Sequence, residues 1–117
     1  MLSGERTRTN SFSPLKIGYQ TQKKDNKTII YPHGWEIKKD QFVQLVDQAE
    51  KNVLDFYPQQ FPFTIILAKN SLDLLRFTGM ERGGNNSLGR IYISSSYMDE
   101  GLITAELSHY YLFNIAK

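Results

Sequence analysis

Three short stretches of the chain carry the apolar patterns of β-strands. Residues 28–31 (Thr-Ile-Ile-Tyr) combine β-branched and aromatic side chains and end at a Pro-His-Gly turn, which predicts a short strand. Residues 63–68 (Phe-Thr-Ile-Ile-Leu-Ala) form a continuous apolar run, which favours a strand buried on both faces. Residues 90–94 (Arg-Ile-Tyr-Ile-Ser) place isoleucine at every second position, which predicts a third strand.

Three other stretches are predicted to be helices. Asp40 is a potential N-cap for a first helix, whose apolar positions continue at helical spacing to about Tyr57, just before a proline. Asn70 or Ser71 is expected to cap a shorter Leu-rich helix that ends at a glycine. A last helix is predicted over residues 100–115, after Asp99 and a run of serines that offer N-cap side chains.

The order of these elements predicts an α+β fold. We expect a small single domain in which a short sheet packs against two or three helices. Residues 79–89 (Gly-Met-Glu-Arg-Gly-Gly-Asn-Asn-Ser-Leu-Gly) predict a flexible loop between the second helix and the third strand. The glycine spacing in this loop matches neither the P-loop nor the dinucleotide-binding pattern, so we expect no phosphate-binding loop there.

The composition narrows the class of protein. At 117 residues and 40% hydrophobic residues, the chain is long enough for one small core and too short for two. It has no cysteine, which rules out disulfides and thiolate metal sites. Its apolar runs are far shorter than the ~20 residues of a membrane span, and its first ten residues are too polar for a signal peptide. A soluble cytoplasmic protein without a membrane partner is therefore expected.

The net charge of +2 is unevenly distributed. Residues 1–27 contain six basic and two acidic residues, whereas residues 28–117 contain eight basic and ten acidic residues. We therefore predict a basic, mobile N-terminal arm (residues 1–27) and a folded domain (residues 28–117). Because the arm has neither an arginine-rich cluster nor interleaved aromatic residues, nucleic acid is not expected as a partner.

The last predicted helix contains Ala-Glu-Leu-Ser-His at residues 105–109, which is an incomplete zinc-protease motif. In H-E-x-x-H, two histidines one helical turn apart reach the same Zn²⁺, and the glutamate beside the first polarises a metal-bound water. Glu106 and His109 occupy two of these positions, but Ala105 stands where the first histidine belongs. A Glu-x-x-His pair alone arises by chance in about one chain in ten of this composition, so its surroundings must support it.

Residues 63–113 resemble the core of small gluzincin-type metallopeptidases, such as the peptidase MA-like and SprT-like groups. The shared features are a strand, a short Leu-rich helix, a Gly-rich loop, an edge strand of the Gly-Arg-Ile-Tyr-Ile-Ser type and then the motif helix. The resemblance implies a zincin-like domain with Glu106 as catalytic general base and His109 as zinc ligand. It also implies that the last strand lines the cleft and offers its backbone to a peptide substrate through Arg90, Ile91, Tyr92 and Ile93.

The chain departs from this family at the metal site. The methyl group of Ala105 cannot bind zinc, and the family's third ligand, usually a glutamate beyond the motif helix, has no counterpart in the eight residues after His109. Catalytic zinc normally has three protein ligands, so we expect no cofactor in this chain, and zinc only if the site is completed. The side chains that could complete it, if the fold brought them close, are His33, Glu36, Asp99 and Glu100.

Three functional hypotheses remain open. The first is a degenerate metallopeptidase-like domain, inactive as it stands, that binds a protein or peptide by strand addition at residues 90–94. The second is a fragment or active-site variant of a zinc-dependent peptidase, in which Ala105 replaced a histidine. The third is a structural or assembly protein unrelated to zincins.

Several of the same residues also have plain structural interpretations. Glu106 and His109 could form a surface pair three residues apart on the helix. The run of aromatic and apolar residues at 110–113 is too continuous for one buried stripe, so part of it is expected to be exposed and to cover a partner. Core positions in this helix are predicted at Leu102, Ile103, Leu107 and either Tyr110 or Tyr111. Trp35 is either a core residue closing a turn or a ring that anchors a ligand.

Overall fold

The three predicted strands form the centre of a five-stranded mixed sheet in the computed structural model, which describes residues 18–78, 84–87 and 90–116. Across the sheet the strands are β1 (Tyr19–Lys24), β2 (Lys27–Pro32), β3 (Phe63–Ala68), β5 (Arg90–Ser94) and β4 (Gly84–Ser87). The central strands β2, β3 and β5 are parallel, whereas β1 and β4 pair antiparallel at the two ends.

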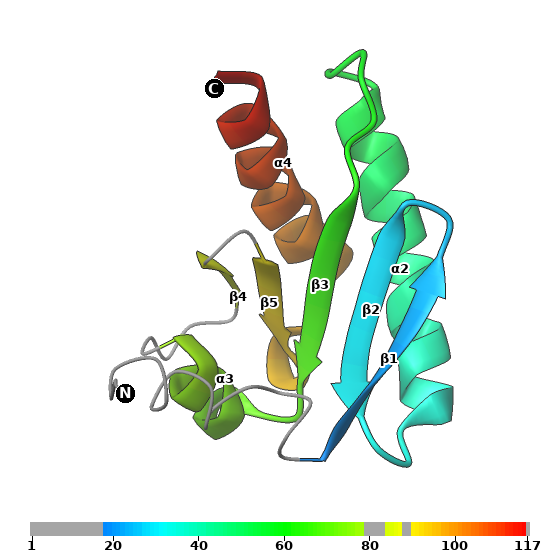
Figure 1. The fold of residues 1–117 in the computed structure, drawn as a ribbon, viewed down its shortest axis with the longest axis vertical. Helices are drawn as coiled ribbons and strands as arrows, with labels where there is room; N and C mark the ends of the chain where they lie inside the picture. The colour runs from blue at the N-terminus through cyan, green and yellow to red at the C-terminus, as the bar shows by residue number, and fades with distance from the viewer. Residues whose placement is uncertain (1–17, 79–83, 88–89, 117) are drawn as a thin grey trace, which may run out of the picture.

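Helices cover both faces of this sheet. Helices α2 (Glu36–Leu54) and α4 (Glu100–Ala116) pack on one face, and the shorter α3 (Ser71–Thr78) packs on the other (Figure 1). A single 3₁₀ turn, η2 (Ser95–Tyr97), joins β5 to α4. The result is the expected small α+β domain with a C-terminal helix. Within the described segments, none of the helices has the length and apolar character needed to cross a bilayer.

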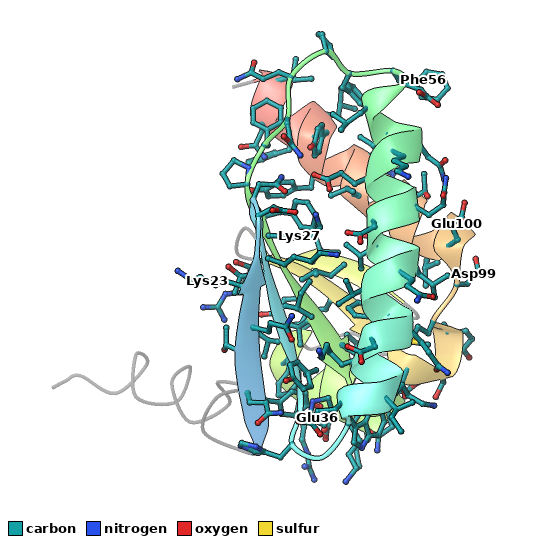
Figure 2. All side chains as sticks on the ribbon, turned by 90° about the vertical axis from the view of Figure 1, so that its right-hand side faces the viewer. Lys23, Lys27, Glu36, Phe56, Asp99 and Glu100 are labelled. Carbon is teal, nitrogen blue, oxygen red and sulfur yellow. The ribbon has the colours of Figure 1, made fainter. Side chains whose placement is uncertain are left out.

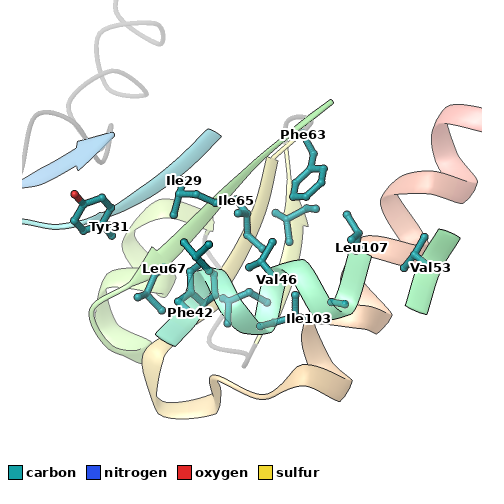
Figure 3. Packing of buried hydrophobic residues seen from close by; sticks show 14 of the residues in the cluster. Ile29, Tyr31, Phe42, Val46, Val53, Phe63, Ile65, Leu67, Ile103 and Leu107 are labelled. Atoms are coloured by element: carbon teal, nitrogen blue, oxygen red, sulfur yellow. The ribbon is translucent and has the colours of Figure 1, made fainter. Parts of the chain in front are cut away.

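The main core lies between the sheet and the pair α2 and α4. Ile29, Ile65 and Ile91 stand side by side on β2, β3 and β5 and are fully buried. They meet side chains from both helices, including Phe42, Val46, Ile103 and Leu107 (Figure 3). On the opposite face, Ile30, Ile66 and Tyr92 form a second row that packs with Leu74 of α3. Because both faces of the central strands are buried, residues 63–68 are apolar without alternation.

Strand β1 corrects the predicted extent of the N-terminal arm. Residues 19–27 were assigned to a mobile arm, but Tyr19–Lys24 pairs along its whole length with β2 through a tight turn at Asp25, which has φ of 56°. Tyr19 is buried, and its hydroxyl donates to Asp73 Oδ2 at 2.7 Å and accepts from the Lys69 N–H at 2.8 Å. The folded domain therefore includes β1, and residues 1–17 of the predicted arm lie outside the described residues.

Two other boundaries differ from the prediction. The N-cap of α2 is Trp35, which makes no side-chain capping hydrogen bond, and the helix ends at Leu54. Asp40 lies inside the helix, where it accepts from the Lys39 ammonium at 2.7 Å. Gly84–Ser87, predicted as loop, is strand β4, because pairing with β5 compensates for a sequence without apolar alternation. The rest of the predicted loop, residues 79–83 and 88–89, lies outside the described residues.

Candidate functional site at helix α4 and the sheet edge

Helix α4 carries the motif residues and is fixed at its start by a capping bond. Asp99 Oδ2 accepts from the Leu102 N–H at 3.0 Å, as its predicted N-cap role requires. The helix packs against α2 on one side and against β5 and β4 on the other. Its inward stripe, Ile103, Leu107 and Tyr111, is fully buried, which determines the side of the helix that faces outward.

The motif positions lie on the outward side of α4. Ala105 and His109 are both exposed and lie one turn apart, as the two histidines of H-E-x-x-H would. Glu106 is partly buried, because it is offset by one residue towards the inward stripe. The structure therefore brings Ala105 and His109 to one common face of the helix, and this face is not part of the core.

Two tyrosines hold the C-terminal half of α4 against the segment that enters β3. The Tyr110 hydroxyl donates to the carbonyl of Pro62 at 2.7 Å, and the Tyr111 hydroxyl accepts from the Phe61 N–H at 3.1 Å. Tyr111 is fully buried with its ring 5.1 Å from that of Phe61, and burial raises the pKa of its phenol. Of the two tyrosines named as core candidates, Tyr111 is buried and Tyr110 is partly buried against the core.

The same helix leaves apolar side chains in solvent near its end. Leu112 is 55% exposed and Phe113 is 64% exposed. This confirms that part of the aromatic and apolar run at 110–113 lies on the surface.

The strand at residues 90–94 was predicted to be the edge strand, and this is wrong. β5 pairs with β3 on one side and with β4 on the other, so its backbone has no open edge for a peptide. The reason is that the sequence assigned to a loop supplies one more strand. Within the described chain, the edge of the sheet next to α4 is β4.

The four residues predicted to bind substrate do not share one surface. Ile91, Tyr92 and Ile93 are buried, with alternate side chains in the two cores on opposite faces of the sheet. Arg90 is exposed. It lies two residues before Tyr92 in the strand, so it points to the same face of the sheet as Tyr92, away from α4. Their predicted role in substrate binding remains a prediction.

The four side chains that could have completed a metal site lie in two separate groups. His33 and Glu36 lie before and at the start of α2, where Gln20 bridges them at 2.9 Å to His33 Nδ1 and 2.6 Å to Glu36 Oε2. Asp99 and Glu100 lie at the start of α4, well away from Glu36 (Figure 2). Across residues 18–78, 84–87 and 90–116, no three histidine, aspartate or glutamate side chains come together as metal ligands would.

A buried charged network beneath β2 was missed by the sequence analysis. Lys27 Nζ lies 2.8 Å from Glu50 Oε1 and 3.4 Å from Asp47 Oδ1, between the sheet and α2 (Figure 2). Asn26 and Gln60 each donate an amide hydrogen bond to Glu50 Oε2 at 2.9 Å. The available signal was the spacing of Glu50, which falls on the apolar stripe of its helix and therefore points inward.

Hydrogen bonds determine the protonation of this network. Burial alone would raise the pKa of Glu50, but hydrogen bonds from Lys27, Gln60 and Asn26 outweigh it and lower the pKa. Burial would likewise lower the pKa of Lys27, yet its hydrogen bond to Glu50 and the nearby carboxylate charges raise it. Both side chains are therefore charged at neutral pH, and the network joins the β1–β2 turn, α2 and the segment before β3.

Comparison of the chain with protein-family models, with curated proteins and with solved structures found no significant match. The case for any function therefore depends on the geometry of α4 and β4 and on the sequence motif.

Proposed function

We propose that this chain is a metallopeptidase-like domain without a working zinc site, and that it binds an extended protein or peptide segment by strand addition at β4. The observation that carries the proposal is the position of β4: it is the terminal, antiparallel strand of the described sheet and lies beside the helix that bears the motif. A segment added to β4 would run next to α4, whose exposed face contains Ala105 and His109.

The composition of the two sheet edges favours β4 over β1. Lysines and other charged side chains on an edge strand discourage pairing with a further strand. β1 ends in Lys23 and Lys24, and Lys24 is held in an ion pair with Asp47 at 2.7 Å. The β4 sequence, Gly-Asn-Asn-Ser, contains no charged residue and no proline, so every residue retains a backbone N–H.

Binding without cleavage follows from the chemistry of the motif helix. A zinc peptidase needs a metal-bound water as nucleophile, and one imidazole does not retain zinc. His109 has no histidine partner one turn earlier, because Ala105 occupies that position. Glu106 without a bound metal has no activated water from which to take a proton.

Strand addition can be tested with methylated peptides. A peptide selected by display against the whole chain is synthesised with single N-methyl groups at successive backbone positions. In a strand, alternate N–H groups face the neighbouring strand, so methylation should abolish binding at every second residue and spare the residues between. Equal tolerance at all positions, measured by calorimetry, would contradict strand addition.

The alternative of an active-site variant is tested at Ala105. The proposal predicts that the natural chain contains no zinc by elemental analysis and leaves the selected peptide intact. Ala105→His is compared with Ser108→His, which adds a histidine on the same helix at a position that does not match the motif. Tight zinc binding with proteolysis in Ala105→His alone would favour the peptidase variant over the binding domain.

A further inference from the structure

An open cavity of about 490 Å³ lies beside the start of α2, away from α4 and β4. The residues that line it are Gly34, Trp35, Glu36, Ile37, Lys38 and Gln41. Its volume falls within the few hundred to a thousand Å³ that is usual for sites of small ligands.

A rigid aromatic ring forms one wall of this cavity. Trp35 is partly buried and packs against the main core, so its indole is held in place by the fold. Gly34 precedes it with φ of 82°, and a Cβ added there would meet no atom of a more distant residue within 4 Å, so the space over Gly34 is open. Ile37, which is 79% exposed, adds a second apolar surface.

The polar side chains of the cavity offer both donors and acceptors. The Glu36 carboxylate is an acceptor held by the Gln20 amide at 2.6 Å, and the exposed Gln41 amide can donate and accept. Lys38 adds a donor, with its ammonium 5.5 Å from the centre of the Trp35 ring. The charges of Glu36 and Lys38 offset each other, so the lining has no net charge.

We propose that this cavity binds a neutral saccharide. A pyranose ring has a flat C–H face that can stack on an indole, and its hydroxyl groups both donate and accept hydrogen bonds, as the mixed lining requires. Because the charges of Glu36 and Lys38 cancel, the lining favours neither an anion nor a cation, and a purely apolar ligand would cover Glu36 and Gln41 without giving them a hydrogen bond. The exposed Lys38 side chain can leave the ring and bind a hydroxyl group.

The single tryptophan of the chain makes the site directly observable, because all tryptophan emission comes from Trp35. The whole chain is titrated with the neutral disaccharides cellobiose, maltose and diacetylchitobiose, and with galacturonate and glucosamine disaccharides as charged probes. At least one neutral disaccharide should change the emission saturably at millimolar concentrations, and neither charged probe should bind more tightly.

Two variants connect that signal to the cavity. Gln41→Ala should weaken binding by about fivefold or more, since one hydrogen bond contributes about 1 kcal/mol. Gln44→Ala, at another exposed position of α2, should leave it unchanged, and both substitutions are compatible with a helix. Amide chemical shifts of Gly34 and Glu36 report binding that leaves the emission unaltered. The inference is overturned if no neutral disaccharide perturbs either signal, if a charged probe binds more tightly, or if Gln41→Ala has no effect.

Discussion

At the scale of single residues, the Lys27–Glu50 pair is the most consequential contact, because neither side chain is more than 8% exposed. Glu50→Gln leaves the Lys27 ammonium buried with Asp47 as its nearest charge, and should lower the free energy of unfolding by about 3 kcal/mol or more. Urea denaturation at neutral pH measures this loss. Lys51→Ala, at an exposed position of the same helix, should stay within about 0.5 kcal/mol.

The same pair allows a second test, because both charges can be removed together. Lys27→Met combined with Glu50→Leu removes both buried charges and should recover much of the stability lost in Glu50→Gln. A double variant as unstable as the single one would show that the amide hydrogen bonds to Glu50, and not the ion pair, carry the effect.

Tyr111 is the other residue on which the candidate site depends. Tyr111→Phe removes the acceptor of the Phe61 N–H and should lower the free energy of unfolding by about 1–3 kcal/mol in a urea titration. His109→Ala, on the exposed side of α4, should change it by less than about 0.5 kcal/mol. A large loss in His109→Ala would contradict the outward orientation of the motif face.

At the scale of elements, the sequence predicted the strands and helices that a local pattern of residues identifies. It missed the strands that form only by pairing with a neighbouring strand. β3 was predicted from its continuous apolar run, and α4 from the N-cap side chains that precede it and the helical spacing of its motif. β1 and β4 were missed because they are polar and extended only through their neighbours. The sequence therefore predicted one part of the candidate site, because helical spacing places Ala105 and His109 on one face. It did not predict the other part, because β4 could not be recognised as the edge strand.

The start of α4 gives a prediction at the same scale. Asp99→Ala removes the acceptor for the Leu102 N–H and should cost about 1 kcal/mol of stability, whereas Asp99→Asn should retain most of it. Thermal unfolding followed by circular dichroism compares the two. Equal losses would show that the charge of Asp99 near the helix N-terminus, and not the capping bond, is responsible.

At the scale of the whole molecule, the side chains whose pKa values are changed by folding define a range of pH in which the fold is most stable. The pKa values of Glu50 and Asp47 are lowered in the folded state, so their stabilisation is present above their unfolded values and is lost as pH falls below about 4. The pKa values of Lys27, Tyr19 and Tyr111 are raised, so their contribution is present below about pH 10 and is lost as pH rises further.

Unfolding midpoints measured from pH 3 to pH 11 should therefore form a plateau that falls at both ends. Glu50→Gln should flatten the acid side, because the group that takes up the proton there is gone. An acid limb of unchanged steepness in that variant would assign the acid loss to other carboxylates, with Asp47 as the first to examine.

The position of β5 between β3 and β4 also has a consequence for synthesis on the ribosome. β3 emerges first, but its neighbour β5 is complete only at Ser94, about 26 residues later, which takes about 1–5 s at usual translation rates. During that interval Ile65, Ile66 and Leu67 have one partner strand and an open edge. A chaperone that recognises extended apolar segments is therefore expected to engage the nascent chain at β3 and to be released as β5 pairs there.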